Sequence, residues 1–200
     1  MLEADGAIVS GNRTKDLRRG GLYIGDDDRD DDNYTDGVIV RGNWFDGADE
    51  EAVFRANNAR SLTLESNVFI NTQCRAKKEA AQFRGGSGNC RGNVYLGSIA
   101  AGQTPNGRII SAQFAFKDET IYGYVLAQAG AVLTFDGGLL SLAKSYNIRG
   151  VTYTLANGGG GYAFTAKKAA NGLPDAKLIA RGVKIVGAKY EAGGLAKVVK

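Results

Sequence analysis

Histidine is absent from this chain of 200 residues, and cysteine, proline and long apolar runs are scarce. Without an imidazole the chain can form no histidine base, no catalytic Ser–His pair and no histidine-bound metal site. The two cysteines, Cys74 and Cys90, are too few for a disulfide framework. No apolar run reaches the roughly 18 residues that a spanning helix needs, so we expect no membrane span.

Glycine, in contrast, is abundant: 29 of 200 residues, alongside only two prolines. Many glycines among short β-branched runs indicate a β protein with frequent tight corners. The first residues show no basic region followed by an apolar core, so we expect no signal peptide. Their strand pattern begins almost at once, which suggests a fragment of a longer protein.

Four segments align on an asparagine, which predicts repeated coils. They cover residues 6–14, 37–45, 61–69 and 86–95, and their anchors are spaced by 31, 24 and 26 residues: Asn12, Asn43, Asn67 and Asn93. One coil of a parallel β-helix needs roughly that length. Asparagine tolerates left-handed backbone at a corner, and stacked amides can form a hydrogen-bonded ladder. We therefore expect an all-β parallel β-helix, a solenoid in which the asparagines are structural.

Rows of equivalent positions flank the anchors and predict which side chains face inward. Three residues before the anchors are Val9, Val40, Leu64 and Cys90, which we expect to stack inside the coils. Two residues after three of the anchors are Phe45, Phe69 and Tyr95, an expected aromatic stack. Two residues before the anchors are Ser10, Arg41, Glu65 and Arg91, an outward row. Its alternating charges favour a ladder of salt bridges; a ligand-facing groove is the alternative.

We expect a second strand to recur at residues 52–56, 81–85 and 112–116, which share the pattern Ala–x–Phe. It places Phe54, Phe83 and Phe114 in the core, with Val53 and Arg55 facing outward. Beyond residue 100 the register becomes indistinct. We divide the chain into parallel β-helix coils at 1–104 and either continued β-helix or a C-terminal β-rich cap or trimerisation region at 105–200.

Seven aspartates lie within residues 25–36. Such a loop is most simply a solvated insertion at a corner, but hard cations bind several carboxylate oxygens, so calcium is the cofactor that it would favour. The candidate metal ligands are Asp26, Asp28, Asp30 and Asp32. Contact with a sugar is the third interpretation.

Glycoside hydrolysis requires two carboxylates on either side of the bond, and neighbouring coils can supply such a pair. The catalytic candidates are Asp26, Asp27 and Glu65. Exposed arginines can bind acidic sugars through bidentate contacts with carboxylates, although a solvated face is the simpler explanation. The candidate carbohydrate-binding residues are Arg41, Trp44, Arg55, Arg84 and Arg91.

The asparagine-anchored repeat resembles the pectate-lyase-like right-handed parallel β-helix superfamily, and especially bacteriophage tailspike proteins, over about residues 1–100. Gly25–Asp26–Asp27 resembles the carboxylate pair of polygalacturonases, but their Gly–His–Gly element is missing, as is the Arg–x–Pro–x–x–Arg element of pectate lyases. The resemblance implies work on polysaccharides rather than any one activity.

We therefore expect a tailspike-like virion protein that recognises, and in one version degrades, a bacterial surface polysaccharide. The resemblance further implies a homotrimer, contact with other virion tail proteins, and a location on the phage tail or outside the cell, with no nucleic-acid partner. The alternatives are a free-standing polysaccharide hydrolase or lyase, and a non-catalytic structural or adhesin module.

Overall fold

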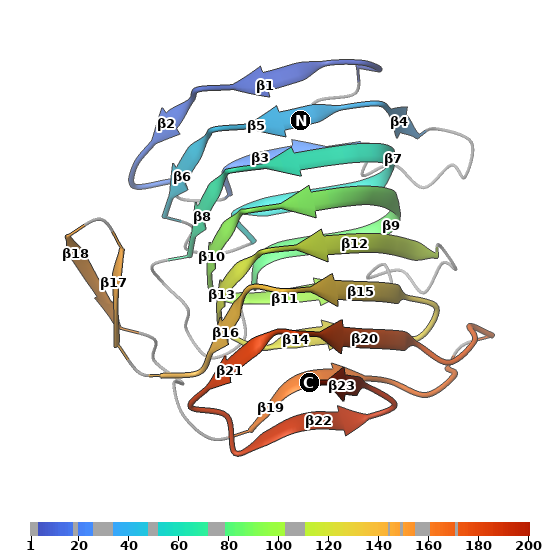
Figure 1. Cartoon of the computed structure of the whole chain (residues 1–200). Coiled ribbons are helices and arrows are strands. Elements are labelled where there is room, and N and C mark those ends of the chain that lie inside the picture. The colour runs from blue at the N-terminus through green and yellow to red at the C-terminus, as the bar shows by residue number, and fades with distance from the viewer. Residues whose placement is uncertain are drawn as a thin grey trace.

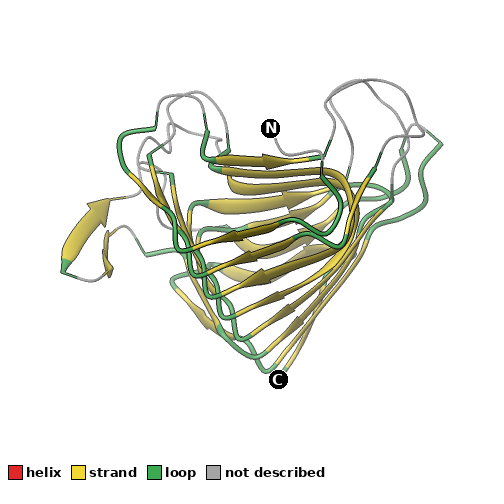
Figure 2. Ribbon diagram, turned by 90° about the horizontal axis from the view of Figure 1, so that it is seen from above, coloured by secondary structure: helices red, strands yellow, loops and turns green. Residues whose placement is uncertain are grey.

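The computed structural model describes residues 4–17, 20–25, 34–47, 52–71, 79–102, 111–143, 145–148, 150–154, 161–170 and 172–200. Every regular element in these ranges is a β-strand, which confirms the predicted all-β class. Most strands belong to two sheets of parallel strands, and Figure 2 shows that these sheets form three walls around an interior. We call them the front, side and back walls.

The chain visits the walls in a repeated order: front, then side, then back (Figure 1). The front wall contains β1 (Ile8–Ser10), β4 (Thr35–Asp36), β5 (Ile39–Arg41), the second halves of β7 (Phe54–Glu65) and β9 (Glu79–Arg91), β12 (Ala112–Lys117), β15 (Val132–Asp136), β20 (Lys177–Arg181) and β23 (Lys197–Val199). The side wall contains β2 (Arg13–Thr14), β6 (Trp44–Asp46), β8 (Val68–Ile70), β10 (Val94–Leu96), β13 (Thr120–Tyr122), β16 (Leu139–Ser141) and β21 (Lys184–Val186). The back wall contains β3 (Leu22–Ile24), the first halves of β7 and β9, β11 (Ser98–Ala101), β14 (Val125–Ala127), β19 (Tyr162–Ala166) and β22 (Tyr190–Gly194).

Strands on both sides of residues 103–110 join these same sheets: β12 pairs with β9, and β13 pairs with β10. A separate antiparallel hairpin, β17 (Ser145–Ile148) and β18 (Val151–Thr154), stands beside the side wall (Figure 1). Tyr146 of this hairpin packs on Tyr122, with ring centroids 4.2 Å apart, and donates its hydroxyl hydrogen to the Ser141 carbonyl oxygen at 2.9 Å. The hairpin therefore helps to cover the apolar outer face of the side wall, where Ile70 and Leu96 are buried.

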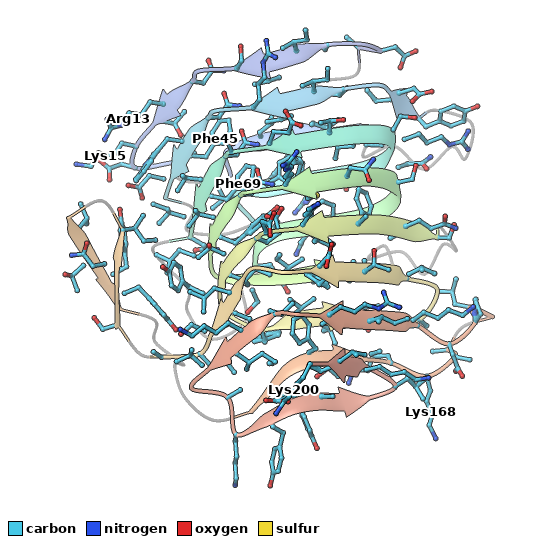
Figure 3. All side chains as sticks on the ribbon, in the orientation of Figure 1. Arg13, Lys15, Phe45, Phe69, Lys168 and Lys200 are labelled. Atoms are coloured by element: carbon cyan, nitrogen blue, oxygen red, sulfur yellow. The ribbon has the colours of Figure 1, made fainter. Side chains whose placement is uncertain are left out.

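The predicted inward rows are confirmed by the strand register. Val40, Leu64 and Cys90 are paired in succession, so these three side chains lie one above another. Phe45 and Phe69 stack with centroids 5.9 Å apart, and Figure 3 labels both within the stack of coils. Tyr95 continues this row at 5.5 Å from Phe69. The rows thus form one continuous apolar core between the walls.

The Ala–x–Phe segments do not form one recurring strand, which corrects the sequence interpretation. Phe54, Phe83 and Phe114 are all buried as expected, but Phe114 lies on the front wall and the other two lie on the back wall. Phe54 pairs with an alanine, and Phe114 pairs with Gly88, where an added Cβ would lie 3.0 Å from the phenylalanine ring. At these two positions the small partner leaves room for the phenylalanine ring, whereas other rows stack one aromatic ring on another. Val53, expected to face outward, is fully buried.

The corner between the front and side walls is formed by the residue before each anchor, not by the anchor itself. Seven corner residues have φ between 53° and 69°: Gly11, Gly42, Ser66, Gly92, Asp118, Gly137 and Gly182. Glycine adopts this left-handed conformation without steric cost, which explains its repetition here. The anchor asparagines do not have positive φ, so the expected left-handed role belongs to their neighbours.

Candidate functional site

The outer face of the front wall carries a shallow groove that crosses several coils. In Ala112–Lys117, one of its strands, buried and exposed side chains alternate strictly, so every second residue faces outward. One part of the groove is open to solvent, has a volume of about 660 Å³ and has uncharged side chains as its polar lining: Ser61, Thr63, Ser87, Asn89, Gln113 and Thr134. Ala115 lies on its floor. Hydroxyl and amide groups of this kind both donate and accept hydrogen bonds, which suits a ligand rich in hydroxyl groups.

A row of charged residues borders the groove, and four of its members line the second part, which has a volume of about 300 Å³: Glu65, Arg91, Lys117 and Asp136. Strand pairing places these residues in succession on neighbouring coils: Arg41, Glu65, Arg91, Lys117, Asp136 and Arg181. We call this set the charged row. All six side chains are exposed. The register confirms the outward row expected for Arg41, Glu65 and Arg91 and extends it beyond residue 100.

The expected salt bridges within this row are not formed. No two members of the charged row come within the 4.0 Å that defines an ion pair, whereas Lys200 and Glu191, elsewhere in the described residues, do so at 3.7 Å. Exposed ion pairs stabilise a fold by only about 0–1 kcal/mol, so their absence costs the fold little. These charged groups are therefore available to a ligand in solution.

The five predicted carbohydrate-binding residues are distributed over all three walls. Arg41 and Arg91 belong to the charged row, and Arg91 also lines the groove. Arg55 and Arg84 lie on the back wall, where Arg55 is only 6% exposed and its guanidinium carbon lies 4.5 Å from the centroid of the Tyr23 ring. Trp44 lies on the side wall, with the Arg13 guanidinium 5.5 Å from its ring centroid. Arg41 and Arg91 thus share the front wall, two strands apart, and Arg55 and Arg84 lie on neighbouring strands of the back wall, so the five residues do not form one site.

Of the predicted catalytic residues, Asp26 and Asp27 lie outside the described residues. Glu65 is described, exposed and next to the groove. The next carboxylate along the charged row is Asp136, three strands away, or about 14 Å at the usual strand spacing. That separation exceeds the roughly 5–9.5 Å that paired-carboxylate hydrolysis needs. Glu65 and Asp136 therefore cannot act as such a pair.

The predicted calcium ligands Asp26, Asp28, Asp30 and Asp32 also lie outside the described residues. Within the part of the chain that is described, no three Asp, Glu or Cys side chains cluster closely enough to hold a metal ion. The calcium site therefore stays a prediction from sequence.

The asparagine ladder is confirmed, and its amide-to-amide bonds all point in one direction. The Nδ2 groups of Asn12, Asn43 and Asn67 each donate to the Oδ1 of the next anchor, at 3.0, 2.9 and 2.9 Å. Each of these backbone N–H groups donates to that same oxygen. A ladder with one direction must end on a group that only needs to accept hydrogen bonds. Sequence reasoning did not identify that group.

Glu119 is the terminal acceptor. Asn93 donates from Nδ2 to Oε1 at 3.2 Å and from its backbone N–H to Oε2 at 3.1 Å. Glu119 is only 3% exposed, and this burial raises its pKa to about 8, although the bonds from Asn93 favour the ionised form. Its place was visible in the sequence, because Lys117–Tyr122 aligns with Arg91–Leu96 and puts Glu119 at the anchor position.

Two more ionisable groups lie near this carboxyl. Burial raises the pKa of the Cys90 thiol and the Tyr95 hydroxyl well above their usual values, and the charge of Glu119 raises both further. The Tyr95 hydroxyl has no hydrogen-bond partner of good geometry within the described residues. Cys90 is therefore a buried, unreactive side chain, as its place in an inward row predicted.

Comparison of the chain with protein-family models, with curated proteins and with solved structures finds no match in any of the three. No helix long and apolar enough to cross a membrane occurs in the described residues.

Proposed function

We propose that the chain winds as a right-handed parallel β-helix. The repeated order of front, side and back walls and the parallel pairing between successive passes support this fold. Figure 1 supports the right-handed sense, because the front strands run to the left, the back strands run to the right, and the chain descends from its N-terminus. The resemblance of the asparagine repeat to tailspike coils agrees with this proposal.

On this fold we propose a tailspike-like virion protein that recognises a bacterial surface polysaccharide along the outer face of the front wall. The observation that carries the proposal is the continuity of the groove across β7, β9, β12 and β15. A small molecule would contact one or two coils, whereas a polymer parallel to the stack can meet equivalent side chains on each coil. The polar lining with a small residue at its floor, Ala115, gives such a chain room and hydrogen-bonding groups.

Binding without cleavage is the version that the described groove favours, because Glu65 and Asp136 are too far apart for hydrolysis by paired carboxylates. A homotrimer on the phage tail remains part of the proposal. Light scattering checks it: a mass near three times 21.1 kDa supports the trimer, and a mass of one chain rejects it.

The binding proposal is tested by filling the groove. Ala115→Trp places an indole on the groove floor, and Ala115 faces outward, so the core is not disturbed. Thr152→Trp is the matched control, since Thr152 is also exposed on a strand but belongs to the β18 hairpin. Both variants and the parent chain are tested against immobilised capsular polysaccharides and lipopolysaccharides.

We expect the parent and the control to retain one or more glycans that Ala115→Trp loses by at least about tenfold, or about 1.4 kcal/mol. New reducing ends in the same samples would indicate hydrolysis, and a new unsaturated-sugar absorbance would indicate a lyase. If no glycan binds, or if both tryptophan variants bind as the parent does, the groove is not a polysaccharide site.

A further inference from the structure

The order of charges in the charged row is the starting point. From Arg41 to Arg181 the signs run positive, negative, positive, positive, negative, positive. The alternation fails at one place, where Arg91 and Lys117 are direct neighbours on β9 and β12. Like charges opposite each other on adjacent strands destabilise a sheet. Neither side chain forms an ion pair with another member of the row, so this repulsion is not relieved within it.

The position of this pair gives it a relation to the groove. Arg91 and Lys117 both line the part of the groove that continues from its uncharged part. Their outward spacing is about 4.8 Å at the backbone, close enough for one carboxylate, sulfate or phosphate group to contact both cations. Glu65 and Asp136 flank the pair, one strand away on each side. The nearest cations beyond those carboxylates are Arg41 and Arg181.

We infer that the groove selects an acidic polysaccharide whose charged sugars are separated by uncharged ones, with one anionic group seated between Arg91 and Lys117. This inference rests on the proposed function and specifies its ligand. A sugar unit of an extended chain is about as long as one strand spacing, about 4.8 Å. A polymer with an acid on every sugar would therefore place an anion on both sides of Glu65 and on both sides of Asp136. A polymer with an acid on every second sugar places only one anion beside each of these carboxylates, on the side of Arg41 or Arg181, and puts sugar hydroxyl groups on the other side, where they can donate hydrogen bonds to the carboxylate.

The test compares oligosaccharides of equal length and different charge spacing. Hyaluronan oligosaccharides carry a carboxylate on every second sugar, polygalacturonate oligosaccharides carry one on every sugar, and chitin oligosaccharides carry none. Dissociation constants are measured for the complete chain by calorimetry at low ionic strength, because screening weakens exposed contacts as salt rises. We expect hyaluronan oligosaccharides to bind at least about tenfold more tightly than polygalacturonate oligosaccharides.

Three variants assign this preference to the charged row. Lys117→Glu reverses one cation of the pair and should weaken hyaluronan binding about tenfold while leaving chitin oligosaccharides unaffected. Lys184→Glu makes the same charge change at an exposed position of the side wall and should change neither. The double variant Glu65→Gln/Asp136→Asn removes both flanking carboxylates and should improve polygalacturonate binding. Thermal unfolding of each variant checks that the fold is retained.

The inference is overturned if polygalacturonate binds the parent as tightly as hyaluronan does, if Lys117→Glu and Lys184→Glu behave alike, or if neither acidic ligand binds. Failure of the proposed function is a different result: a bacterial glycan binds, and Ala115→Trp does not reduce that binding. A groove that binds uncharged glycans and is blocked by Ala115→Trp would keep the proposed function while rejecting the spaced-acid ligand.

Discussion

Replacing Glu119 with glutamine should change how the stability of the fold depends on pH. The carboxyl has a pKa of about 8 in the folded chain, raised by burial from 4.5. It therefore binds more protons when folded than when unfolded between these values, and the free energy of unfolding falls as pH rises from about 4.5 to about 8. Each pKa unit corresponds to about 1.4 kcal/mol. The parent should lose about 3–4 kcal/mol from this group between pH 5 and pH 8.

Glutamine cannot reproduce the bonds that protonated glutamate makes at low pH. Both oxygens of Glu119 accept hydrogen bonds from Asn93, and the hydroxyl oxygen of a protonated carboxyl still accepts while it donates. An amide nitrogen cannot accept, so one Asn93 donor would lose its partner, at a cost of about 1–3 kcal/mol. Glu119→Gln should therefore be less stable than the parent at pH 5 and should lose that disadvantage, or reverse it, by pH 8.

Chemical denaturation of both chains at steps between pH 5 and pH 8 measures this effect. The difference between the two chains isolates Glu119, because the other ionisable groups are shared. A change of 3–4 kcal/mol corresponds to roughly 6–16 °C in melting temperature for a chain of this size. The reasoning is refuted if the difference in unfolding free energy between parent and variant is constant across this pH range.

Three further predictions concern the ladder, the corners and the buried thiol. Asn67→Ala removes four side-chain hydrogen bonds and should lower the free energy of unfolding in urea by about 3–5 kcal/mol. Asn12→Ala, at the exposed end of the ladder, should lower it by only about 1 kcal/mol, and equal losses would contradict this account. Gly138→Ala should lower the melting temperature far more than Gly150→Ala. Both glycines have positive φ (90° and 84°), but only a Cβ at position 138 would meet backbone of the preceding coil, at Glu119; similar melting points would reject this explanation. Cys90, in a variant lacking the other cysteine, should resist a thiol reagent at pH 8 until the chain is unfolded, and rapid labelling of the folded chain would contradict its burial.

The asparagine ladder and the inward rows could be predicted from sequence because each depends on a residue type that repeats. Asn43 and Asn67 must both be asparagine, since each amide accepts from one coil and donates to the next. Once Glu119 ends the ladder, that requirement disappears, and the next two anchor positions are Gly138 and Val183. The repeat therefore loses its marker after residue 100 although the strands continue to stack.

Insertion and packing hide the rest of the pattern. The β17–β18 hairpin lies between β16 and β19 and lengthens that pass of the chain, so a constant spacing between anchors fails there. In the core, Phe114 pairs with Gly88, so the combined volume of the two side chains is constrained there and the residue type at each position is not. The groove was only partly predictable, because Arg41, Glu65 and Arg91 were visible as a row but Lys117 lies beyond the asparagine repeat.

The ladder and the groove are physically linked at Lys117 and Glu119. Lys117 is the last residue of β12 and lines the groove. Two residues later, the buried Glu119 side chain accepts the hydrogen bond from Asn93 that ends the ladder. The bonds from Asn93 hold this coil against the one above it, so they also fix the spacing between Arg91 and Lys117 on the outer face. A substitution that weakens the ladder end should therefore disturb the Arg91–Lys117 pair before it unfolds the stack. Amide hydrogen exchange near Lys117 should rise in Glu119→Gln at pH 5, while exchange at β5 and the first coils should stay close to that of the parent.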